Sequence, residues 1–345
     1  TWQFSESQIS WDVAQQKEQL VISDGAVAFN FIPSLKQVNF ASGDFKVLQS
    51  GSHWPEFSFR GFARQDALGV NLSTLDISAA IELLPLVLTS SEQRQLLADL
   101  DMSGELSDVH YTQHCENYRA AASLVGFSNR QVGDIPGINN ADLSFVVRDG
   151  IFAANLSAEN GQLDFGSLFN RPIPYESINS KIDGVIGEDG WRVNVDELLL
   201  SSSELQLDAS LQLNKHQQEP LKMALLASIL NGDVQYANHY YPEELMGEDL
   251  VNYLNKALVK GQLTQANVVI NGPLNKFPFI NNEGVFVVDA ELTDGTFRFD
   301  EQWPAISAFD ANLNFTNDSM LITARQGVLS GLDVEGVTAS MDSLS

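Results

Sequence analysis

The segment GVFVVDAELTDGTFRFDEQWPAISAFDANLNF, residues 284–315, decides the fold class. Its apolar side chains recur at every second position in two runs: Phe286, Val288, Ala290 and Leu292, then Phe309, Ala311, Leu313 and Phe315. This period of two is typical of a β-strand with one apolar face, because successive side chains of a strand point to opposite sides. Asp294-Gly295 between the runs predicts a hairpin turn, since Gly adopts positive φ without steric cost. The segment therefore predicts antiparallel strands that each have one apolar side.

The same alternation recurs along most of the chain. It is cleanest in LQLDASLQL, residues 205–213, where one predicted face carries Leu205, Leu207, Ala209, Leu211 and Leu213. Turn signals separate the runs: Asp24-Gly25, Asp149-Gly150, Asn160-Gly161 and Asp189-Gly190. No Gly/Ser-rich linker or low-complexity tract interrupts them. The chain is therefore predicted to be mostly β, with a predominantly antiparallel sheet and a few short amphipathic helices.

Two segments have helical periodicity instead, residues 90–100 and residues 241–261. Leucines share one face of each predicted helix: Leu96, Leu97 and Leu100 in the first, and Leu250, Leu254 and Leu258 in the second. Each segment is followed closely by a Gly-x-Leu strand start, at Gly104 and at Gly261. A helix, a Gly-x-Leu start and a train of strands thus occur twice, which indicates a divergent internal repeat. We expect one continuous β-segment over residues 1–345, with repeat units 1–89, 90–240 and 241–345.

Composition limits the possible partners. The 345 residues include 45 acidic and 19 basic residues, for a formal net charge of −26. This charge repels phosphate backbones, which argues against nucleic-acid binding, and it leaves no basic patch for anionic lipid headgroups. A lipid partner would have to be held by its tails. The longest apolar stretch, Ile77 to Leu88, is too short to cross a bilayer, which requires about 20 apolar residues.

Motifs that carry catalysis are absent from the sequence. There is no Gly-x-Ser-x-Gly elbow, P-loop, dinucleotide fingerprint or His-Glu-x-x-His motif. The best metal candidate is HYTQHCE, with His110, His114, Cys115 and Glu116, but it follows a strand start, so a solvated loop is the favoured interpretation. The remaining histidines, His239 among them, are expected at the surface. We predict no catalytic residue, no metal site and no cofactor.

Several longer motifs occur in a characteristic order. They include LADLDMSGELSDVHY (97–111), the Pro136-Gly137-Ile138 turn, NGPLNKFPF (271–279) and Trp303-Pro304. From about Leu72 onward this order resembles the bacterial AsmA-like superfamily, and most closely its YhdP family, which is related to TamB. The resemblance covers roughly three quarters of the chain, and its most specific parts are residues 271–279 and Trp303-Pro304.

The resemblance implies an elongated, curved β-sheet folded into a U-shaped, taco-like groove that is apolar inside. It implies a bridge across the Gram-negative periplasm that carries phospholipid from the inner to the outer membrane. Its partners would be phospholipid acyl chains and, through parts of the protein absent here, inner- and outer-membrane components. The chain would be an interior fragment, anchored to the inner membrane through a segment outside it, and it would not be an enzyme.

The groove is expected to be lined by inward-facing apolar side chains: Phe145, Val147, Leu205, Leu207, Leu211, Leu213, Phe286, Val288, Leu292, Phe309, Leu313 and Phe315. The helix near residues 247–260 either caps the open side of this groove or packs as ordinary core. Leu211→Asp and Leu313→Glu are expected to block lipid passage. Two alternatives remain open, a closed β-sandwich or solenoid that serves as a structural or interaction module without lipid, and a carbohydrate-acting enzyme on a β-solenoid.

Overall fold

The computed structural model describes residues 1–13, 16–49, 52–78, 81, 91–300 and 302–343. The chain divides into two compact units. The first unit contains residues 1–132 and 137–156, and the second contains residues 133–136 and 157–345. Most of the apolar stretch from Ile77 to Leu88, and the predicted repeat boundary at residues 89–90, lie outside the described residues.

The first unit is a sheet whose pairings are antiparallel. Its strands are β1 (Trp2–Val13), β2 (Gln16–Ile32), β3 (Gln37–Ser42), β4 (Lys46–Gln49), β5 (Ser52–His53), β6 (Phe59–Arg64), β7 (Ala67–Asp76), β8 (Ser103–His114), β9 (Asn117–Asn129) and β10 (Gly137–Arg148). Strand β2 pairs with β1 on one side and with both β3 and β4 on the other. From β3 onward the order is β3–β6–β7–β8–β9–β10. Strand β11 (Ile151–Asp164) runs from this unit into the next.

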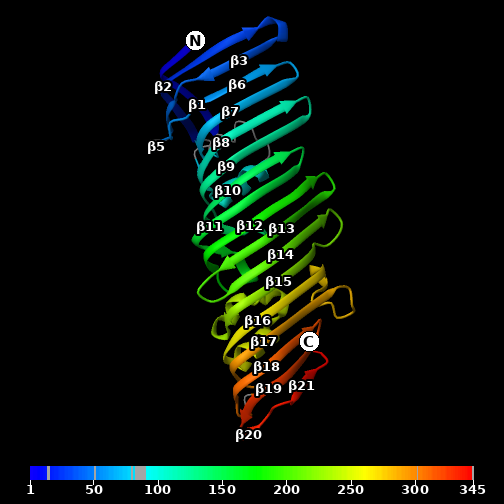
Figure 1. The fold of residues 1–345 in the computed structure, drawn as a ribbon. Coiled ribbons are helices and arrows are strands. Elements are labelled where there is room, and N and C mark those ends of the chain that lie inside the picture. The colour runs from blue at the N-terminus through cyan, green and yellow to red at the C-terminus, as the bar shows by residue number, and fades with distance from the viewer. Residues whose placement is uncertain (14–15, 50–51, 79–80, 82–90, 301, 344–345) are drawn as a thin grey trace. The chain divides into compact units, whose positions relative to one another are not determined.

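The second unit is an antiparallel meander. Its strands are β12 (Ile173–Gly187), β13 (Gly190–Ser201), β14 (Gln206–His216), β15 (Lys222–Asp233), β16 (Leu258–Pro273), β17 (Val285–Phe297), β18 (Ile306–Thr316), β19 (Ser319–Leu329), β20 (Leu332–Asp333) and β21 (Thr338–Met341). From β12 to β19 each strand pairs with the next one in sequence, as Figure 1 shows. Strand β19 also pairs with β20 and β21. The predicted mostly β, predominantly antiparallel fold is confirmed.

The helices are short. Those that lie wholly in the described part of the chain are η1 (Pro33–Leu35), α2 (Ser91–Leu100), η3 (Gly166–Leu168), η4 (Val234–Tyr240), α3 (Glu243–Met246), α4 (Glu248–Ala257) and η5 (Leu274–Lys276). Both helical predictions are confirmed, although the second segment contains two helices, α3 and α4, that meet at Gly247. Strand β16 begins at Leu258, so the last leucine of the predicted stripe already belongs to a strand. Among the described residues, no helix has the length and hydropathy needed to cross a membrane.

The predicted turns at Asp24-Gly25, Asn160-Gly161 and Asp294-Gly295 are wrong. Asp149-Gly150 lies in a turn between strands and Asp189 lies in the turn that ends where Gly190 starts β13, but Asp24-Gly25, Asn160-Gly161 and Asp294-Gly295 lie within β2, β11 and β17. At Asp294 the chain adopts φ 49°, and the register of β17 against β18 shifts between Leu292 and Gly295. A left-handed residue followed by Gly also forms a β-bulge, which bends a strand without ending it.

Bulges of this kind recur along the sheet. A residue with positive φ accompanies a register shift in several strands: Asp108 in β8, Asn140 in β10, Glu197 in β13 and Ala308 in β18. Because a bulge increases the local twist and bends its strand, a series of them curves a sheet. Bulged strands are therefore the local cause of the curvature of each unit's sheet.

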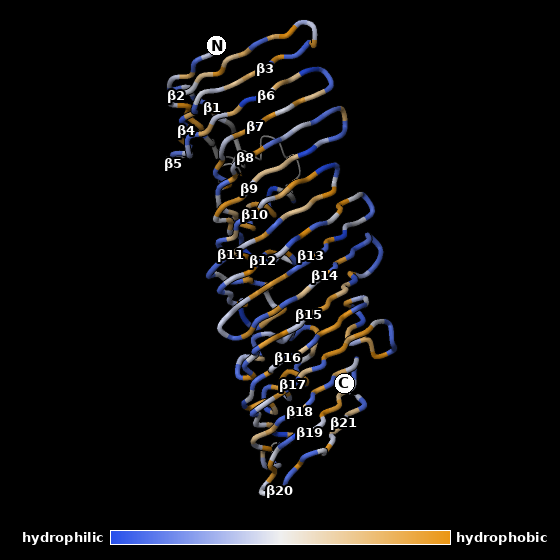
Figure 2. Tube along the Cα trace, viewed as in Figure 1, coloured by the Kyte–Doolittle hydropathy of each residue, from blue (hydrophilic) through white to orange (hydrophobic). Residues whose placement is uncertain are grey.

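Apolar and polar residues alternate along the strands, as Figure 2 shows. In each unit the apolar side carries a buried cluster. The first unit's cluster includes Phe45, Val47 and Trp54, and that of the second unit includes Leu292, Phe297 and Phe309. Each unit therefore has one buried side and one solvated side, as the period of two predicts.

Candidate functional site

An apolar face runs without interruption across strands β14 to β19. Residues that pair directly across antiparallel strands project to the same face. One such row consists of Leu207, Ile229, Ala266, Ala290, Leu313 and Ile322. The next row consists of Ala209, Ala227, Val268, Val288, Phe315 and Met320. The registers therefore build a wall of hydrocarbon from residues that lie more than a hundred positions apart in sequence.

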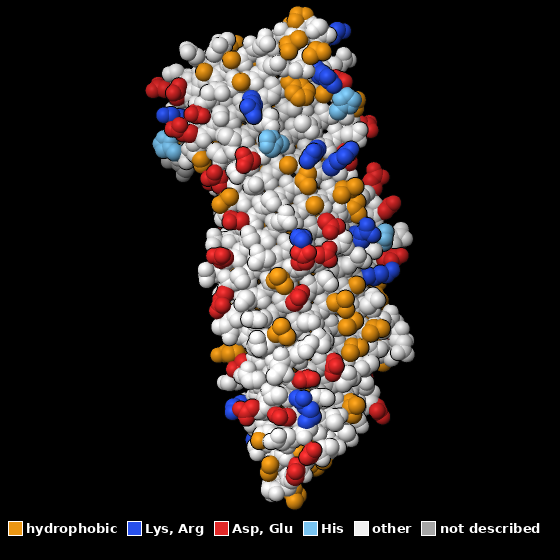
Figure 3. All heavy atoms as spheres, viewed as in Figure 1, with side chains coloured by type: hydrophobic (Ala, Val, Ile, Leu, Met, Phe, Trp, Pro, Cys, Tyr) orange, Lys and Arg blue, Asp and Glu red, His pale blue; other side chains and the backbone are white. Residues whose placement is uncertain are grey.

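The opposite face of the same strands is largely polar. Asn194 Nδ2 donates to Asp183 Oδ2 (2.8 Å), and Gln212 Nε2 donates to Asn194 Oδ1 (2.8 Å) across β12, β13 and β14. Ser228 Oγ donates to Asn267 Oδ1 (2.9 Å) between β15 and β16. In Figure 3 acidic side chains are scattered among uncharged ones over the second unit. The acidic residues thus contribute to a hydrated surface, as expected.

Residues 234–257, comprising η4, α3 and α4, form a helical cap on the apolar face. The cap joins β15 to β16, and Figure 1 shows its helices on one side of β14–β17. The carboxylate of Asp233 accepts a hydrogen bond from the backbone N–H of Gln235 (2.9 Å), which starts η4. Helix α4 buries Val251, Leu254 and Ala257. The predicted leucine stripe therefore faces the sheet, and the helix covers the apolar side.

A cavity of about 740 Å³ lies between the helical cap and the sheet. Its walls are mostly apolar. The sheet contributes residues that include Leu225, Ile229, Val268, Ile270, Phe286, Val288, Leu313 and Phe315, and the cap contributes Tyr240, Tyr241, Leu245, Met246, Leu250, Tyr253 and Leu254. Cavities of this size, with mainly hydrophobic walls, are typical of sites for small apolar ligands. The arrangement is suited to holding hydrocarbon.

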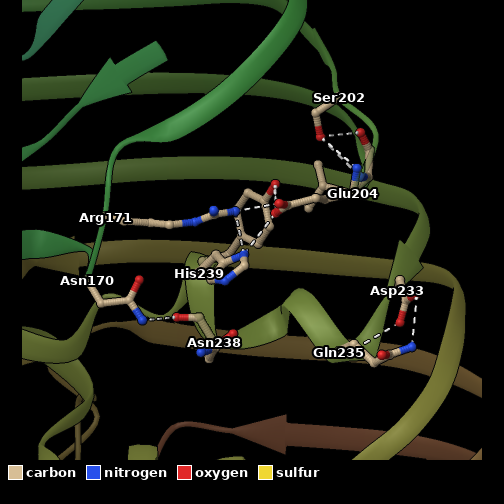
Figure 4. Close-up of polar contacts among 10 residues, drawn as sticks. Asn170, Arg171, Ser202, Glu204, Asp233, Gln235, Asn238 and His239 are labelled. Carbon is tan, nitrogen blue, oxygen red and sulfur yellow. Dashed lines mark hydrogen bonds and ion pairs between the residues drawn. The ribbon is translucent and has the colours of Figure 1, made fainter.

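A cluster of polar side chains joins the helical cap to two other segments (Figure 4). Glu204 lies between β13 and β14, and its side chain is 9% exposed. Arg171 Nη2 donates to Glu204 Oε1, and the Tyr240 hydroxyl donates to Glu204 Oε2 (3.0 Å). His239 Nδ1 lies 3.0 Å from Glu204 Oε2 and 2.6 Å from Arg171 Nη2. We call Arg171, Glu204, His239 and Tyr240 the polar cluster.

The environment of the polar cluster shifts the pKa of Glu204 and of Tyr240. Burial raises the pKa of Glu204, but hydrogen bonds from His239, Arg171 and Tyr240 outweigh it and hold the pKa below the usual value. Burial raises the pKa of Tyr240 and of Tyr241 to about 12. At neutral pH Glu204 is therefore a carboxylate and both phenols are uncharged. A carboxylate with a lowered pKa is a weaker proton acceptor than a free carboxylate.

Five of the predicted lining residues border the cavity: Leu205, Phe286, Val288, Leu313 and Phe315. Leu207, Leu211 and Leu213 lie on the same face of β14 but do not border it. Leu292 is fully buried in the core cluster, against Gly261. Phe145 and Val147 lie on β10 in the first unit, half-buried and paired with Ala122 and Ala120. The lining role of all these residues stays a prediction.

Phe309 borders a second cavity of about 500 Å³. This cavity lies near the C-terminal end of the same face, and its walls include Trp303, Pro304, Leu329 and Val334. Ile322 borders both cavities. Phe297, which lines the first cavity, packs against Phe299 and Phe309 with ring centroids 4.7 and 5.8 Å apart. An aromatic cluster thus separates the two spaces along the apolar face.

The HYTQHCE segment does not bring its side chains together. His110 and His114 lie on β8, where a spacing of four along an extended chain separates them by about 13 Å. His114 Nε2 lies 3.3 Å from Asp66 Oδ2, His110 is hydrogen-bonded to Asn71, and Cys115 is exposed in the following turn. Within the described part of the chain, no group of three or more His, Cys, Asp or Glu side chains could hold a metal ion.

Several site residues were missed from the sequence. His239, expected at the surface, is only 19% exposed in the polar cluster, so that expectation is wrong. Its partners lie 35 and 68 positions away, and no local pattern could have found them. In NVVING, residues 267–272, the sequence did not decide which face of the strand points inward; in the structure Val268 and Ile270 border the cavity. The aromatic residues of the cap, Tyr240, Tyr241 and Tyr253, also carried no signal of their own.

Comparison with known proteins identifies the family. No solved structure matches this chain. A curated relative, the intermembrane phospholipid transporter YhdP of Escherichia coli strain K12, is 23% identical over 321 residues, covering 87% of this chain and 25% of the relative. The chain thus spans about a quarter of the length of that relative. The family model described as "YhdP protein" matches residues 1–345, so the chain belongs to the YhdP family.

Proposed function

We propose that the groove of the second unit, formed by the apolar face of β14–β19 and the helical cap, holds phospholipid acyl chains during transfer between membranes. The observation that carries this proposal is the cavity of about 740 Å³ with mainly apolar walls on an otherwise solvated sheet. The YhdP relative is named for intermembrane phospholipid transport, which supports the same ligand class. The proposed role requires no catalytic residue, metal or cofactor.

The energetic need for such a groove is large. Exposing one CH₂ group to water costs about 0.8 kcal/mol, so a tail of about 16 carbons faces a penalty on the order of 12 kcal/mol. The five strands β15–β19 at a spacing of about 4.8 Å give a wall about 19 Å wide, comparable to an extended tail. Burial against this wall removes most of the penalty. The groove therefore supplies what a lipid needs outside a bilayer.

The chain would act as one segment of a longer lipid-transfer bridge across the periplasm. In this proposal a segment outside the chain anchors the bridge to the inner membrane, and other parts engage outer-membrane components. Residues 1–345 would contribute one continuous stretch of groove, with the repeat units 1–89, 90–240 and 241–345. Gly104 and Gly261, which lie within the first four residues of β8 and β16, have φ of +131° and +147°, and this likeness supports the repeat.

Adjacent residues on one strand give the sharpest test. Val288 borders the cavity and Val287 projects to the other face, and the same holds for Val268 and Val269 on β16. Val288→Asp and Val268→Asp place a charge in the groove, whereas Val287→Asp and Val269→Asp place it on the polar face. Leu313→Glu, which the sequence suggested, is a less suitable test variant. Leu313 is only 5% exposed, so a buried charge there would destabilise the fold.

The measurement is photo-crosslinking to a phospholipid with a photoreactive acyl chain, supplied in phosphatidylcholine vesicles. We expect Val288→Asp and Val268→Asp to reduce crosslinking at least about tenfold, because a desolvated carboxylate opposes the tail. The two outward variants should crosslink like the wild-type chain, and circular dichroism should show strand content retained in all four. Equal crosslinking by inward and outward variants, or none by the wild-type chain, would contradict the proposal and favour a structural module without lipid.

A further inference from the structure

We propose that the helical cap is a gate over the groove, and that the polar cluster is the latch that holds it closed. This inference rests on the proposed function, because it assigns the regulation of lipid entry to the same groove. The latch connects three segments that are separate in sequence. His239 and Tyr240 belong to the cap, Glu204 lies between β13 and β14, and Arg171 precedes β12.

The sheet does not require the cap for its connectivity. Strand β15 pairs with β16 up to its last residue, with Gly232 opposite Leu263 and Asp233 opposite Gln262, and the first residues of β16 pair only with β17. A hairpin connection of two to five residues would join such ends. Residues 234–257 instead leave the sheet, lie over its apolar face and return. The cap is therefore an addition to the meander, and its role is to cover the groove.

The parts of the cap are attached differently. The α4 end is held by apolar burial of Val251, Leu254 and Ala257 and continues directly into β16. At the other end, Val234 follows β15 directly and is buried in the core cluster. Between these anchors the C-terminal half of η4 is held by polar contacts, in which Asn170 Nδ2 also donates to the backbone carbonyl of Asn238 (2.9 Å). The stretch held by exchangeable hydrogen bonds is thus the part of the cap that opens.

The polar contacts, and not the apolar ones, decide whether the cap is closed or open. When the cap is closed, its inner side chains, such as Leu250 and Tyr253, face the hydrocarbon of the sheet. When a lipid tail occupies the groove, the same side chains can face the tail, and hydrophobic burial is non-directional and proportional to area. The apolar gain is therefore similar in both arrangements. Directional, charge-assisted hydrogen bonds to Glu204 remain as the difference between them.

Glu204 is the central residue of the latch. Its two carboxylate oxygens receive Arg171 on one side and Tyr240 and His239 on the other. Glu204→Gln keeps the shape of the side chain but removes the charge and one acceptor. Tyr240→Phe removes a single hydrogen bond and leaves the charge in place. A matched control is Glu219→Gln, which removes an equally charged side chain that pairs with Lys222 (2.7 Å) but is about half exposed.

The test combines two measurements on the wild-type chain and these variants. The first is amide hydrogen exchange of residues 234–257, which reports how often the cap opens. The second is the rate at which a phospholipid with a fluorescent acyl chain enters the protein from phosphatidylcholine vesicles. For Glu204→Gln we expect cap exchange and lipid entry both to rise about tenfold, and for Tyr240→Phe by a smaller factor, because the open population grows as latch bonds are lost. Glu219→Gln should change neither rate.

The outcomes separate the latch from the groove. If amide hydrogen exchange of the cap is unchanged in both latch variants, the latch is overturned, whatever the rate of lipid entry. Faster cap exchange with unchanged lipid entry would overturn the gate and leave the polar cluster as a structural attachment. No lipid entry in the wild-type chain or any variant would overturn the proposed function, and the gate with it. Tyr240→Phe keeps the test decisive if Glu204→Gln lowers the yield of folded protein.

Discussion

Gly261 lies where β16 passes close to Leu292 and Gly295 of β17. A Cβ at this position would lie 2.6 Å from Leu292 Cδ1 and 3.1 Å from Gly295 Cα, and the backbone φ is +147°. Only Gly adopts this φ without strain. This single residue therefore allows β16 to pack closely on the fully buried Leu292.

Gly261→Ala should accordingly lower the free energy of unfolding by about 2–4 kcal/mol, since backbone strain and overpacking add. Gly43→Ala is the control, because no atom lies within 4 Å of a Cβ there and the φ is not in the left-handed region. That change should be neutral or slightly stabilising. Urea unfolding of both variants provides the measurement, and equal effects would contradict the special role of Gly261.

The Asp-Gly pairs show how far residue-level patterns predict this fold. Asp149-Gly150 and Asp294-Gly295 have the same sequence, and both aspartates adopt positive φ, at 48° and 49°. The first pair makes a turn and the second a bulge within β17. The local conformation was predictable from the residue types, because it is the one that Gly and Asp tolerate. Whether the pair makes a turn or a bulge was not predictable from the residue types. In β17 the pairing with β18 on both sides of Asp294-Gly295 allows the strand to continue.

At the scale of elements, the strands were predictable and the attachment of the cap was not. Alternation alone identified β14, β17 and β18, whose inward faces include Leu207, Phe286 and Leu313. Where both faces of a strand are apolar, as at Val268 and Val269 on β16, only the pairing register selects the inward residue. The polar cluster depends on contacts between residues 33 to 68 positions apart, so no local sequence pattern predicts it.

The attachment of the cap should depend on pH through Glu204. Its pKa is lower in the native state than in the unfolded chain, because its hydrogen bonds outweigh the effect of burial. A group with a lowered native pKa stabilises the fold at pH above its unfolded pKa, and that contribution is lost as the pH falls through the native pKa. The stabilisation is thus fully present at neutral pH, begins to be lost below about pH 4.5, and disappears as the pH falls through the lower native pKa.

The difference in unfolding free energy between the wild-type chain and Glu204→Gln isolates this contribution from that of the other carboxylates. We expect a difference of about 1–2 kcal/mol at pH 7 that shrinks steadily as the pH is lowered from 5 to 3. Urea unfolding at a series of pH values measures it. A difference that stays constant down to pH 3, or grows, would show that the Glu204 charge does not stabilise the native state.

At the scale of the whole molecule, the sequence combines an apolar groove with a strongly acidic exterior. Dispersed carboxylates keep the outer face hydrated, so the hydrocarbon wall can remain available to a ligand without promoting association of the chain. The same charge repels anionic membranes. Its effect extends over a Debye length, which is about 30 Å at 0.01 M salt and about 8 Å at 0.15 M. Contact with a membrane therefore depends on the surface charge of that membrane.

Transfer of a fluorescent phospholipid from the loaded chain to acceptor vesicles tests this consequence of the net charge of −26. At 0.01 M salt we expect transfer to vesicles rich in anionic lipid to be up to about tenfold slower than transfer to phosphatidylcholine vesicles, because like charges reduce the rate of encounter. Raising the salt to 0.15 M should remove most of the difference by accelerating only the anionic case. Equal transfer rates to the two kinds of vesicle at 0.01 M salt would contradict this prediction. They would mean that the net negative charge does not slow the encounter of the chain with anionic membranes.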